Sequence, residues 1–180
     1  MTAADREALR NDLIRDEGLR LAPYKDTVGK WTIGVGYNID DRGLGPLSAA
    51  IGRTPTFDDL QQRGLTRDEA VKVLDADIGY FLDHIQTRFP EFSQLNGVRQ
   101  RAVTNFVFNL GGTRALKFEQ AIAAVRLALQ QPTPAMADTC YTAAAFHIMD
   151  SLWARQIGDG LGGKVDRADR LCRMIRTGKE

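Results

Sequence analysis

Residues 16–37 read DEGLRLAPYKDTVGKWTIGVGY, and the pattern of the chain changes within this stretch. The preceding segment, residues 3–17, carries a short apolar stripe at helical spacing, and Gly18 interrupts it. Aromatic and β-branched residues then alternate with glycine: Trp31, Ile33, Val35 and Tyr37 with Gly34 and Gly36. This alternation is typical of short antiparallel strands. We therefore predict a helix at residues 3–17, followed by a small antiparallel sheet within residues 19–40.

The next segment, residues 41–65, is rich in residues that break regular structure. It contains Gly43, Gly45, Pro46, Gly52, Pro55 and Gly64. Such a composition is typical of loops. We predict that this segment is mostly loop, with one helical turn near residues 47–51.

From Thr66 onward the sequence predicts one helix after another. Thr66 and Glu69 form a capping-box pattern, in which each side chain can accept a hydrogen bond from a backbone amide of the first turn. The helix behind it ends before Pro90, and a second one is predicted from about residue 93 to 110, ending on Gly111 and Gly112. Further helical patterns cover residues 118–131, 135–147, 149–157 and 167–177.

Together these patterns predict one α+β domain that is mainly α, over residues 1–180. A small lobe with the antiparallel sheet would cover about residues 12–65. A larger helical lobe would cover about residues 66–180, with the N-terminal helix packed on it. A cleft between two such lobes is a favoured place for a binding site.

Composition excludes several classes of protein. The chain has 180 residues, 43% of them hydrophobic and 26% charged, and a formal net charge of only +1. These values are ordinary for a globular protein and do not favour nucleic-acid binding. The charged N-terminus lacks the apolar stretch of a secretory signal, and no segment is apolar enough to span a membrane. Cys140 and Cys172 are predicted to be reduced thiols, with a disulfide as the open alternative.

Three polar residues near the predicted sheet have the chemistry of a glycosidase. Cleavage of a glycosidic bond requires a protonated carboxyl group and a second carboxylate, and a hydroxyl can orient the attacking water. Glu17 ends the first helix, Asp26 follows in the first turn of the sheet, and Thr32 lies on a strand. Pairs of acidic residues are common on protein surfaces, so the spacing alone is weak evidence.

The same stretch resembles the signature of the phage-type lysozymes, also called endolysins or muramidases. The resemblance rests on the order Glu, eight residues, Asp, five residues, Thr, and on the DEGLRL, YKDT and TIGVG runs. It resumes at VRQRA (98–102) and NFVFNLG (105–111), then at Phe118, Trp153 and RADR (167–170). It therefore extends over most of the chain, most densely at residues 16–37.

The resemblance implies a lysozyme-like two-lobe fold and hydrolysis of the β-1,4 bond between N-acetylmuramic acid and N-acetylglucosamine. Glu17 would be the general acid, Asp26 the second carboxylate and Thr32 the hydroxyl that orients water. Family members are usually regarded as inverting, so that water attacks directly. Arg167 is expected to pair with Glu17, and Arg170 with Asp16. The alternative for these arginines is a solvated basic stripe.

The resemblance also implies residues that contact sugar, although each has a structural alternative. Asn38, Phe108 and Asn109 would line the cleft, and His147 falls on a position that binds saccharide. Phe108 is equally well explained as core, and an isolated histidine on a helix is more often structural. Trp153 is better explained by core packing than by stacking on a sugar.

Several positions depart from the family pattern. Tyr37 stands where a histidine is common, and Ala121 replaces an expected serine. The glycine-rich segment QIGDGLGGKVD (156–166) is longer than expected and could form a flap or a turn beside the cleft. The segment at residues 40–65 also differs. These changes affect the expected preference for substrate side groups rather than the core reaction.

Two other functions stay open from the sequence. A lytic transglycosylase cuts the same bond but closes an anhydro ring, and a non-catalytic peptidoglycan-binding module could keep the same fold. Glu17, Asp26 and Thr32 together favour hydrolysis. We expect peptidoglycan as the partner, a monomer, and no metal, organic cofactor, nucleic acid or membrane insertion.

The resemblance suggests where such an enzyme would act. We expect synthesis in the host bacterial cytoplasm and action on the cell wall in the periplasm, after release that depends on a holin. A tail-associated lysozyme or a secreted effector would have a similar sequence.

Overall fold

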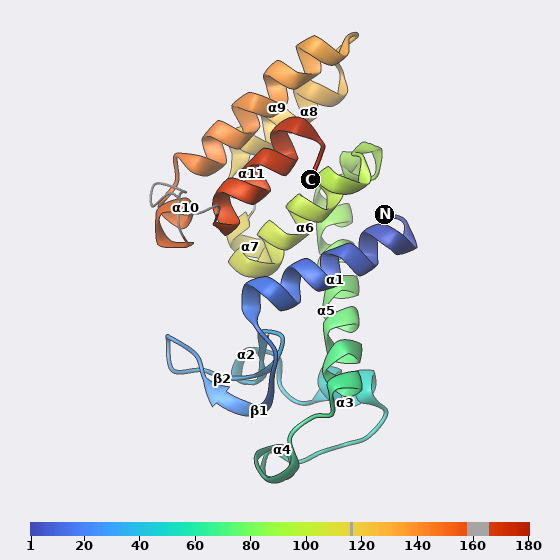
Figure 1. The fold of residues 1–180 in the computed structure, drawn as a ribbon, viewed down its shortest axis with the longest axis vertical. Helices are drawn as coiled ribbons and strands as arrows, with labels where there is room; N and C mark the ends of the chain where they lie inside the picture. Colours follow the sequence, from blue (N-terminus) through green and yellow to red (C-terminus); the bar gives the residue numbers. More distant parts are fainter. Residues whose placement is uncertain (116, 158–165) are drawn as a thin grey trace. The chain divides into compact units, whose positions relative to one another are not determined.

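The computed structural model describes residues 1–115, 117–157 and 166–180. These residues form two compact units. We call Arg10–Tyr80 the sheet unit, and Met1–Leu9 together with Phe81–Glu180 the helical unit. Helices α1 (Ala3–Glu17) and α5 (Arg67–Arg88) each contribute residues to both units (Figure 1). The mainly helical α+β fold agrees with the class predicted from the sequence.

The sheet unit contains the predicted antiparallel sheet. Its three strands are β1 (Arg20–Lys25), β2 (Trp31–Gly34) and β3 (Tyr37–Asn38), paired in that order. The register of β1 against β2 shifts between Arg20 and Tyr24. Pro23 lies within this irregular stretch and has no amide to donate to a neighbouring strand.

The prediction that residues 41–65 are mostly loop is wrong. The structure has three short helices here: α2 (Ile39–Arg42), α3 (Gly45–Ile51) and α4 (Phe57–Arg63). The glycines that suggested loop instead end these helices, at Gly43, Gly52 and Gly64. Helices of one or two turns are too short to show an apolar period, so their signal is in the caps. Thr56, for example, forms a capping box with Asp59.

The core of the sheet unit is apolar and lies between the sheet and the short helices. The core residues are Ile33, Tyr37, Ile39, Leu47, Ile51, Leu60, Leu65, Ala70 and Val73.

The predicted capping box at the start of α5 is confirmed. The Glu69 amide donates to Thr66 Oγ1 (3.1 Å), and the Thr66 amide donates to Glu69 Oε2 (2.8 Å).

A buried ion pair joins α2 to α5 within this unit. Arg42 Nη1 lies 2.7 Å from Asp77 Oδ1, and only 5% of the Asp77 side chain is exposed. The Arg42 guanidinium also lies over the rings of Tyr37 (5.1 Å) and Tyr80 (4.5 Å). Burial raises the pKa of Asp77 to about 6, although the positive charge of Arg42 acts in the opposite direction.

In the helical unit, α5 is followed by a 3₁₀ turn, η1 (Pro90–Gln94), where the sequence predicted the start of a long helix. Helix α6 (Gly97–Leu110) therefore starts later, at the N-cap Asn96, whose side chain accepts from the Arg99 amide. Gly111, at φ +84°, ends α6 as predicted. Gly112 does not extend this cap but begins α7 (Gly112–Ala115).

The other helices match the predicted segments. They are α8 (Glu119–Leu129), α9 (Pro134–Met149), α10 (Leu152–Ile157) and α11 (Arg167–Thr177). Helices α8 and α9 lie side by side, and α11 packs against α9 and α6 (Figure 1). Most of the glycine-rich segment 156–166 lies outside the described residues, so the flap expected there stays a prediction.

The helical unit has the larger apolar core, to which each helix from α6 to α11 contributes buried residues. A cavity of about 80 Å³ lies within this core and is lined almost entirely by apolar side chains, including Val103, Phe106, Ala121 and Val125.

Cys140 and Cys172 are free thiols, as predicted, and burial raises the pKa of Cys172 to about 12.

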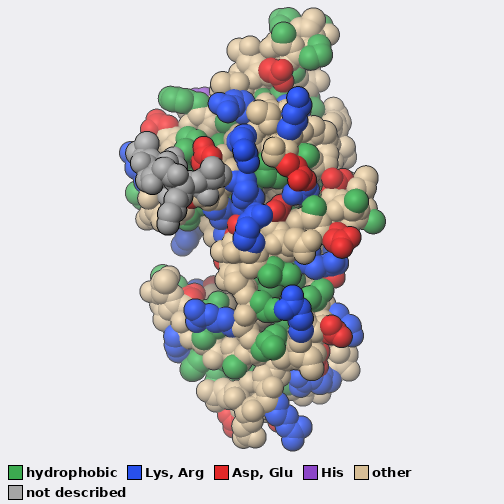
Figure 2. All heavy atoms as spheres, viewed as in Figure 1, with side chains coloured by type: hydrophobic (Ala, Val, Ile, Leu, Met, Phe, Trp, Pro, Cys, Tyr) green, Lys and Arg blue, Asp and Glu red, His purple; other side chains and the backbone are tan. Residues whose placement is uncertain are grey.

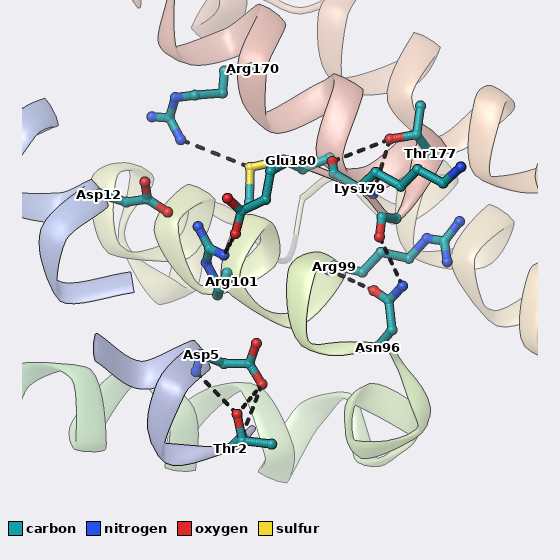
Figure 3. Close-up of polar contacts among 12 residues, drawn as sticks. Thr2, Asp5, Asp12, Asn96, Arg99, Arg101, Arg170, Thr177, Lys179 and Glu180 are labelled. Atoms are coloured by element: carbon teal, nitrogen blue, oxygen red, sulfur yellow. Dashed lines mark hydrogen bonds and ion pairs between the residues drawn. The ribbon is translucent and has the colours of Figure 1, made fainter. Parts of the chain in front are cut away.

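The C-terminal residues are held against the start of α6 (Figure 3). Arg99 Nε donates to the Ile175 carbonyl (2.8 Å), and Asn96 Nδ2 donates to the Gly178 carbonyl (3.1 Å). Arg101 forms an ion pair with Glu180.

Among the described helices, none combines the length and the apolar character needed to cross a membrane.

Candidate active site

Glu17 is the last residue of α1 and is half-buried. Gly18 ends the helix with φ +77°, and its amide donates to the Ile14 carbonyl (3.0 Å). Positive φ is strained for residues with a Cβ atom, so glycine suits this sharp change of direction. The turn into β1 thus fixes where the Glu17 carboxyl group lies relative to the sheet.

Asp26 closes the hairpin turn between β1 and β2. Its Oδ1 accepts hydrogen bonds from the amides of Val28 (2.9 Å) and Lys30 (2.8 Å). Its own amide donates to the Lys30 carbonyl (2.9 Å). Among the described residues, no group donates a hydrogen bond to Oδ2. One oxygen of this carboxylate therefore holds the turn, and the other can serve a ligand.

Thr32 is buried on the central strand, with an exposed fraction of 4%. Its Cα partners are Tyr24 on β1 and Asn38 on β3. Residues directly opposite one another on neighbouring strands project to the same face of a sheet. Tyr24, Thr32 and Asn38 therefore form one row across the sheet, which we call the site row. Asp26 follows Tyr24 by two residues, directly after the end of β1.

Tyr24 is a residue of this site that sequence reasoning did not single out. Burial raises the pKa of the Tyr24 phenol, the Arg20 guanidinium lowers it, and the negative charges of Glu17 and Asp26 raise it further. Both carboxylates therefore lie within electrostatic reach of one phenol. Its position two residues before Asp26, on a strand with a period of two, is the signal in the sequence that could have found it.

Of the predicted sugar contacts, only Asn38 lies in the site row. Its side chain also caps α2, since Oδ1 accepts from the Asp41 amide (2.9 Å). The other three residues belong to the helical unit, and their contact with sugar stays a prediction. There Phe108 packs on Phe81, with ring centroids 5.1 Å apart. His147 is half-buried beside Phe146, at a ring distance of 5.9 Å.

Asn109 and Trp153 are joined in the helical unit. Asn109 Oδ1 accepts a hydrogen bond from Trp153 Nε1 (2.8 Å). Trp153 is buried and meets Phe106 edge to face, with centroids 4.7 Å apart. The prediction that Trp153 is a core residue is confirmed.

The supporting charges lie in both units. Asp16 Oδ1 lies 3.3 Å from Arg15 Nε in the sheet unit. In the helical unit, Arg167 Nε donates to Asn105 Oδ1 (2.9 Å). The expected pairs of Glu17 with Arg167 and of Asp16 with Arg170 would join the two units, and both stay predictions.

Lys and Arg side chains gather near α6 and α11 with Asp and Glu side chains among them (Figure 2).

The described residues contain no group of three or more His, Cys, Asp or Glu side chains placed to hold a metal ion. Glu17, Asp26 and the site row together offer two carboxylic acids, a buried hydroxyl and a phenol. These groups can donate and accept protons and can hold a water molecule.

Comparison with known proteins identifies the family of this chain. The family model for phage lysozyme matches residues 15–155, a range that includes Glu17, Asp26 and Thr32. The chain belongs to the phage lysozyme family. As a member of that family, it has a lysozyme-like role in peptidoglycan degradation as a glycosidase of the muramidase type.

Similar proteins come from a phage and from a eukaryote. The chain is 24% and 25% identical to probable T4-type lysozymes 2 and 1 of Dictyostelium discoideum, with 95% of each chain covered. It is also 29% identical to the pre-baseplate central spike protein Gp5 of Enterobacteria phage T4. That match covers 92% of this chain and 27% of the spike protein. The phage lysozyme domain thus occurs both by itself and within larger proteins.

Proposed function

We propose that this phage lysozyme family member hydrolyses the β-1,4 bond between N-acetylmuramic acid and N-acetylglucosamine in peptidoglycan. One observation carries the proposal. The charges of Glu17 and Asp26 both act on Tyr24, and Tyr24 is paired with Thr32, which has a buried hydroxyl. A glycosidase requires two carboxyl groups at one bond, and here both carboxyl groups lie within electrostatic reach of Tyr24.

The proposed roles are compatible with the position of each group. Glu17, half-buried at the end of α1, donates a proton to the departing glycosidic oxygen. Asp26 keeps Oδ2 directed to the reacting sugar because Oδ1 is held by two backbone amides. There its negative charge stabilises the positive charge that develops on the sugar ring. Thr32 and Asp26 together hold the attacking water, which supplies the new hydroxyl group of the product.

A hydrolase with this site acts differently from a lytic transglycosylase. In the transglycosylase reaction the 6-hydroxyl group of muramic acid attacks, so no water enters the product. A carboxylate and a hydroxyl placed beside the general acid serve water attack. We therefore favour hydrolysis, and the masses of the products, which differ by one water, distinguish the two reactions.

For the biological role, we propose an endolysin that is made in the host cytoplasm and reaches the periplasm after holin-dependent release. The similarity to the central spike protein supports a second candidate, a lysozyme associated with a phage tail. Expression in Gram-negative cells separates the two: an endolysin lyses cells when a holin is co-expressed. A lysozyme that requires the tail does not.

The test is clearing of purified peptidoglycan, or of outer-membrane-permeabilised Gram-negative cells, followed by turbidity. Glu17→Gln should slow clearing at least about 100-fold, because the amide cannot donate the proton to the leaving group. Glu7→Gln is the matched control, since Glu7 is an exposed residue of the same helix. If a folded Glu17→Gln variant clears as fast as the wild type, the proposed reaction is wrong, and a binding module becomes the better explanation.

A further inference from the structure

The register shift in β1 determines which residue faces Thr32. Arg20 is paired with Gly34, and an undisturbed antiparallel register would continue by pairing Ala22 with Thr32. The shift pairs Tyr24 with Thr32 instead. A large aromatic side chain therefore stands in the site row in place of a methyl group. Irregularities of this kind are common next to active sites, where they redirect a side chain.

The ring of Tyr24 is held in place, while its hydroxyl has capacity to bind a ligand. The Arg20 guanidinium lies 4.2 Å from the ring centroid. In residues 1–115, 117–157 and 166–180, the Tyr24 hydroxyl makes no hydrogen bond. Tyr37 on β3 is different, because its hydroxyl donates to the Gly43 carbonyl (2.8 Å) and so serves the fold.

The surroundings of Tyr24 keep its hydroxyl protonated. Burial and the negative charges of Glu17 and Asp26 raise the pKa of the phenol, and the charge of Arg20 offsets only part of this effect. A neutral phenol is a hydrogen-bond donor at every pH where the carboxylates work. Sugars offer hydroxyl and N-acetyl carbonyl oxygens as acceptors for such a donor.

We propose that Tyr24 is a substrate-positioning residue whose hydroxyl donates a hydrogen bond to an oxygen of the saccharide, beside Asp26 and Thr32. This inference rests on the proposed glycosidase function. It adds a contact on the sheet face that holds the sugar ring against the Asp26 carboxylate, while Arg20 keeps the phenol ring from rotating away.

The experiment compares wild type, Tyr24→Phe and Tyr80→Phe on soluble glycan strands from which the stem peptides have been removed. Tyr24→Phe deletes the hydroxyl alone and keeps the ring and its contact with Arg20. Tyr80→Phe is a matched control, because Tyr80 is also in the sheet unit and also lies under an arginine, Arg42, at 4.5 Å. The readouts are kcat/KM across pH and the melting temperature.

We expect Tyr24→Phe to lower kcat/KM about tenfold, by the same factor at every pH, with the melting temperature unchanged. Tyr80→Phe should keep the wild-type kcat/KM. An unchanged kcat/KM in Tyr24→Phe would overturn the inference. So would a shifted pH profile with an unchanged maximum, because Tyr24 would then act through the carboxylates and not on the sugar. An inactive wild type would instead refute the proposed function on which the inference rests.

Discussion

The two units of this protein are stabilised in different ways. The sheet unit has the smaller apolar core and places charge inside it, at Asp77, under the guanidinium of Arg42. The helical unit has the larger core and contains an apolar cavity. The difference teaches that a buried acid makes the stability of the sheet unit depend on pH, whereas the packing of the helical unit can be tested by filling its cavity.

The largest expected effect is on catalysis and belongs to the sheet unit. Asp26→Asn should reduce clearing of peptidoglycan by about 100-fold or more, because a neutral amide cannot stabilise the positive charge on the sugar. The variant should still fold, since the amide oxygen can accept from Val28 and Lys30 as Oδ1 does now. Turbidity and circular dichroism measure the two properties separately.

Asp40→Asn is the control for this variant. Asp40 also accepts a backbone hydrogen bond, from the amide of Trp31 at the start of β2 (2.8 Å), but lies outside the site row. It should clear peptidoglycan at the wild-type rate. Equal clearing by wild type and Asp26→Asn would mean that the reactive groups are not on this hairpin.

The next effect is on the pH dependence of stability, and Asp77 is its source. Folding raises the pKa of this carboxyl group from 3.8 to about 6. The folded state therefore binds a proton more tightly than the unfolded state. The contribution of the protonated Asp77 carboxyl group to the free energy of unfolding is therefore complete below about pH 4. This contribution is lost as the pH rises through about 6. The size is at most about 3 kcal/mol, from the shift in pKa.

Asp77→Asn should remove this part of the pH dependence. The measurement is the free energy of unfolding by urea at several pH values between 4 and 7. Asp75→Asn is the control on the same helix. It removes a half-exposed carboxylate that pairs with Arg10, and it leaves Asp77 unchanged. If the wild-type decline between pH 4 and 6 persists in Asp77→Asn, another group causes it.

The smallest effect tests the helical unit. Val103→Leu adds one methylene group toward the cavity of about 80 Å³ and should stabilise the fold by about 0.8 kcal/mol. Val98→Leu is the control, since Val98 is on the same helix but does not line the cavity. Thermal unfolding followed by circular dichroism compares the two. A loss of stability in Val103→Leu would show that the cavity cannot accept the added volume.

Much of the fold could be predicted because long elements repeat their pattern. Helix α5 shows apolar spacing over several turns, α1 carries a short apolar stripe, and the strand at residues 31–34 alternates with glycine nearby. The prediction failed between residues 41 and 65, where each helix has at most seven residues. There Thr56 and Asp59 form the same kind of capping box that was recognised at Thr66 and Glu69, but no apolar period follows it.

The site was predictable only in part, for a physical reason. Glu17, Asp26 and Thr32 follow from spacing and from resemblance, because the turn and strand that hold them are local in the sequence. Tyr24 depends on the register shift in β1, which is a property of strand pairing and not of composition. The role of Arg167 depends on tertiary contacts, and the structure shows it bonded to Asn105.

The shared carboxylate of Asp26 has a consequence for the evolution of such domains. A descendant that gave up catalysis could replace Glu17 while keeping its helix end, because Gly18 makes the turn. The same descendant would still be selected to keep an oxygen acceptor at Asp26, since two backbone amides of the hairpin depend on it. Among relatives, either aspartate or asparagine at this position is therefore compatible with an intact hairpin, whereas the proposed reaction requires a carboxyl group both here and at Glu17.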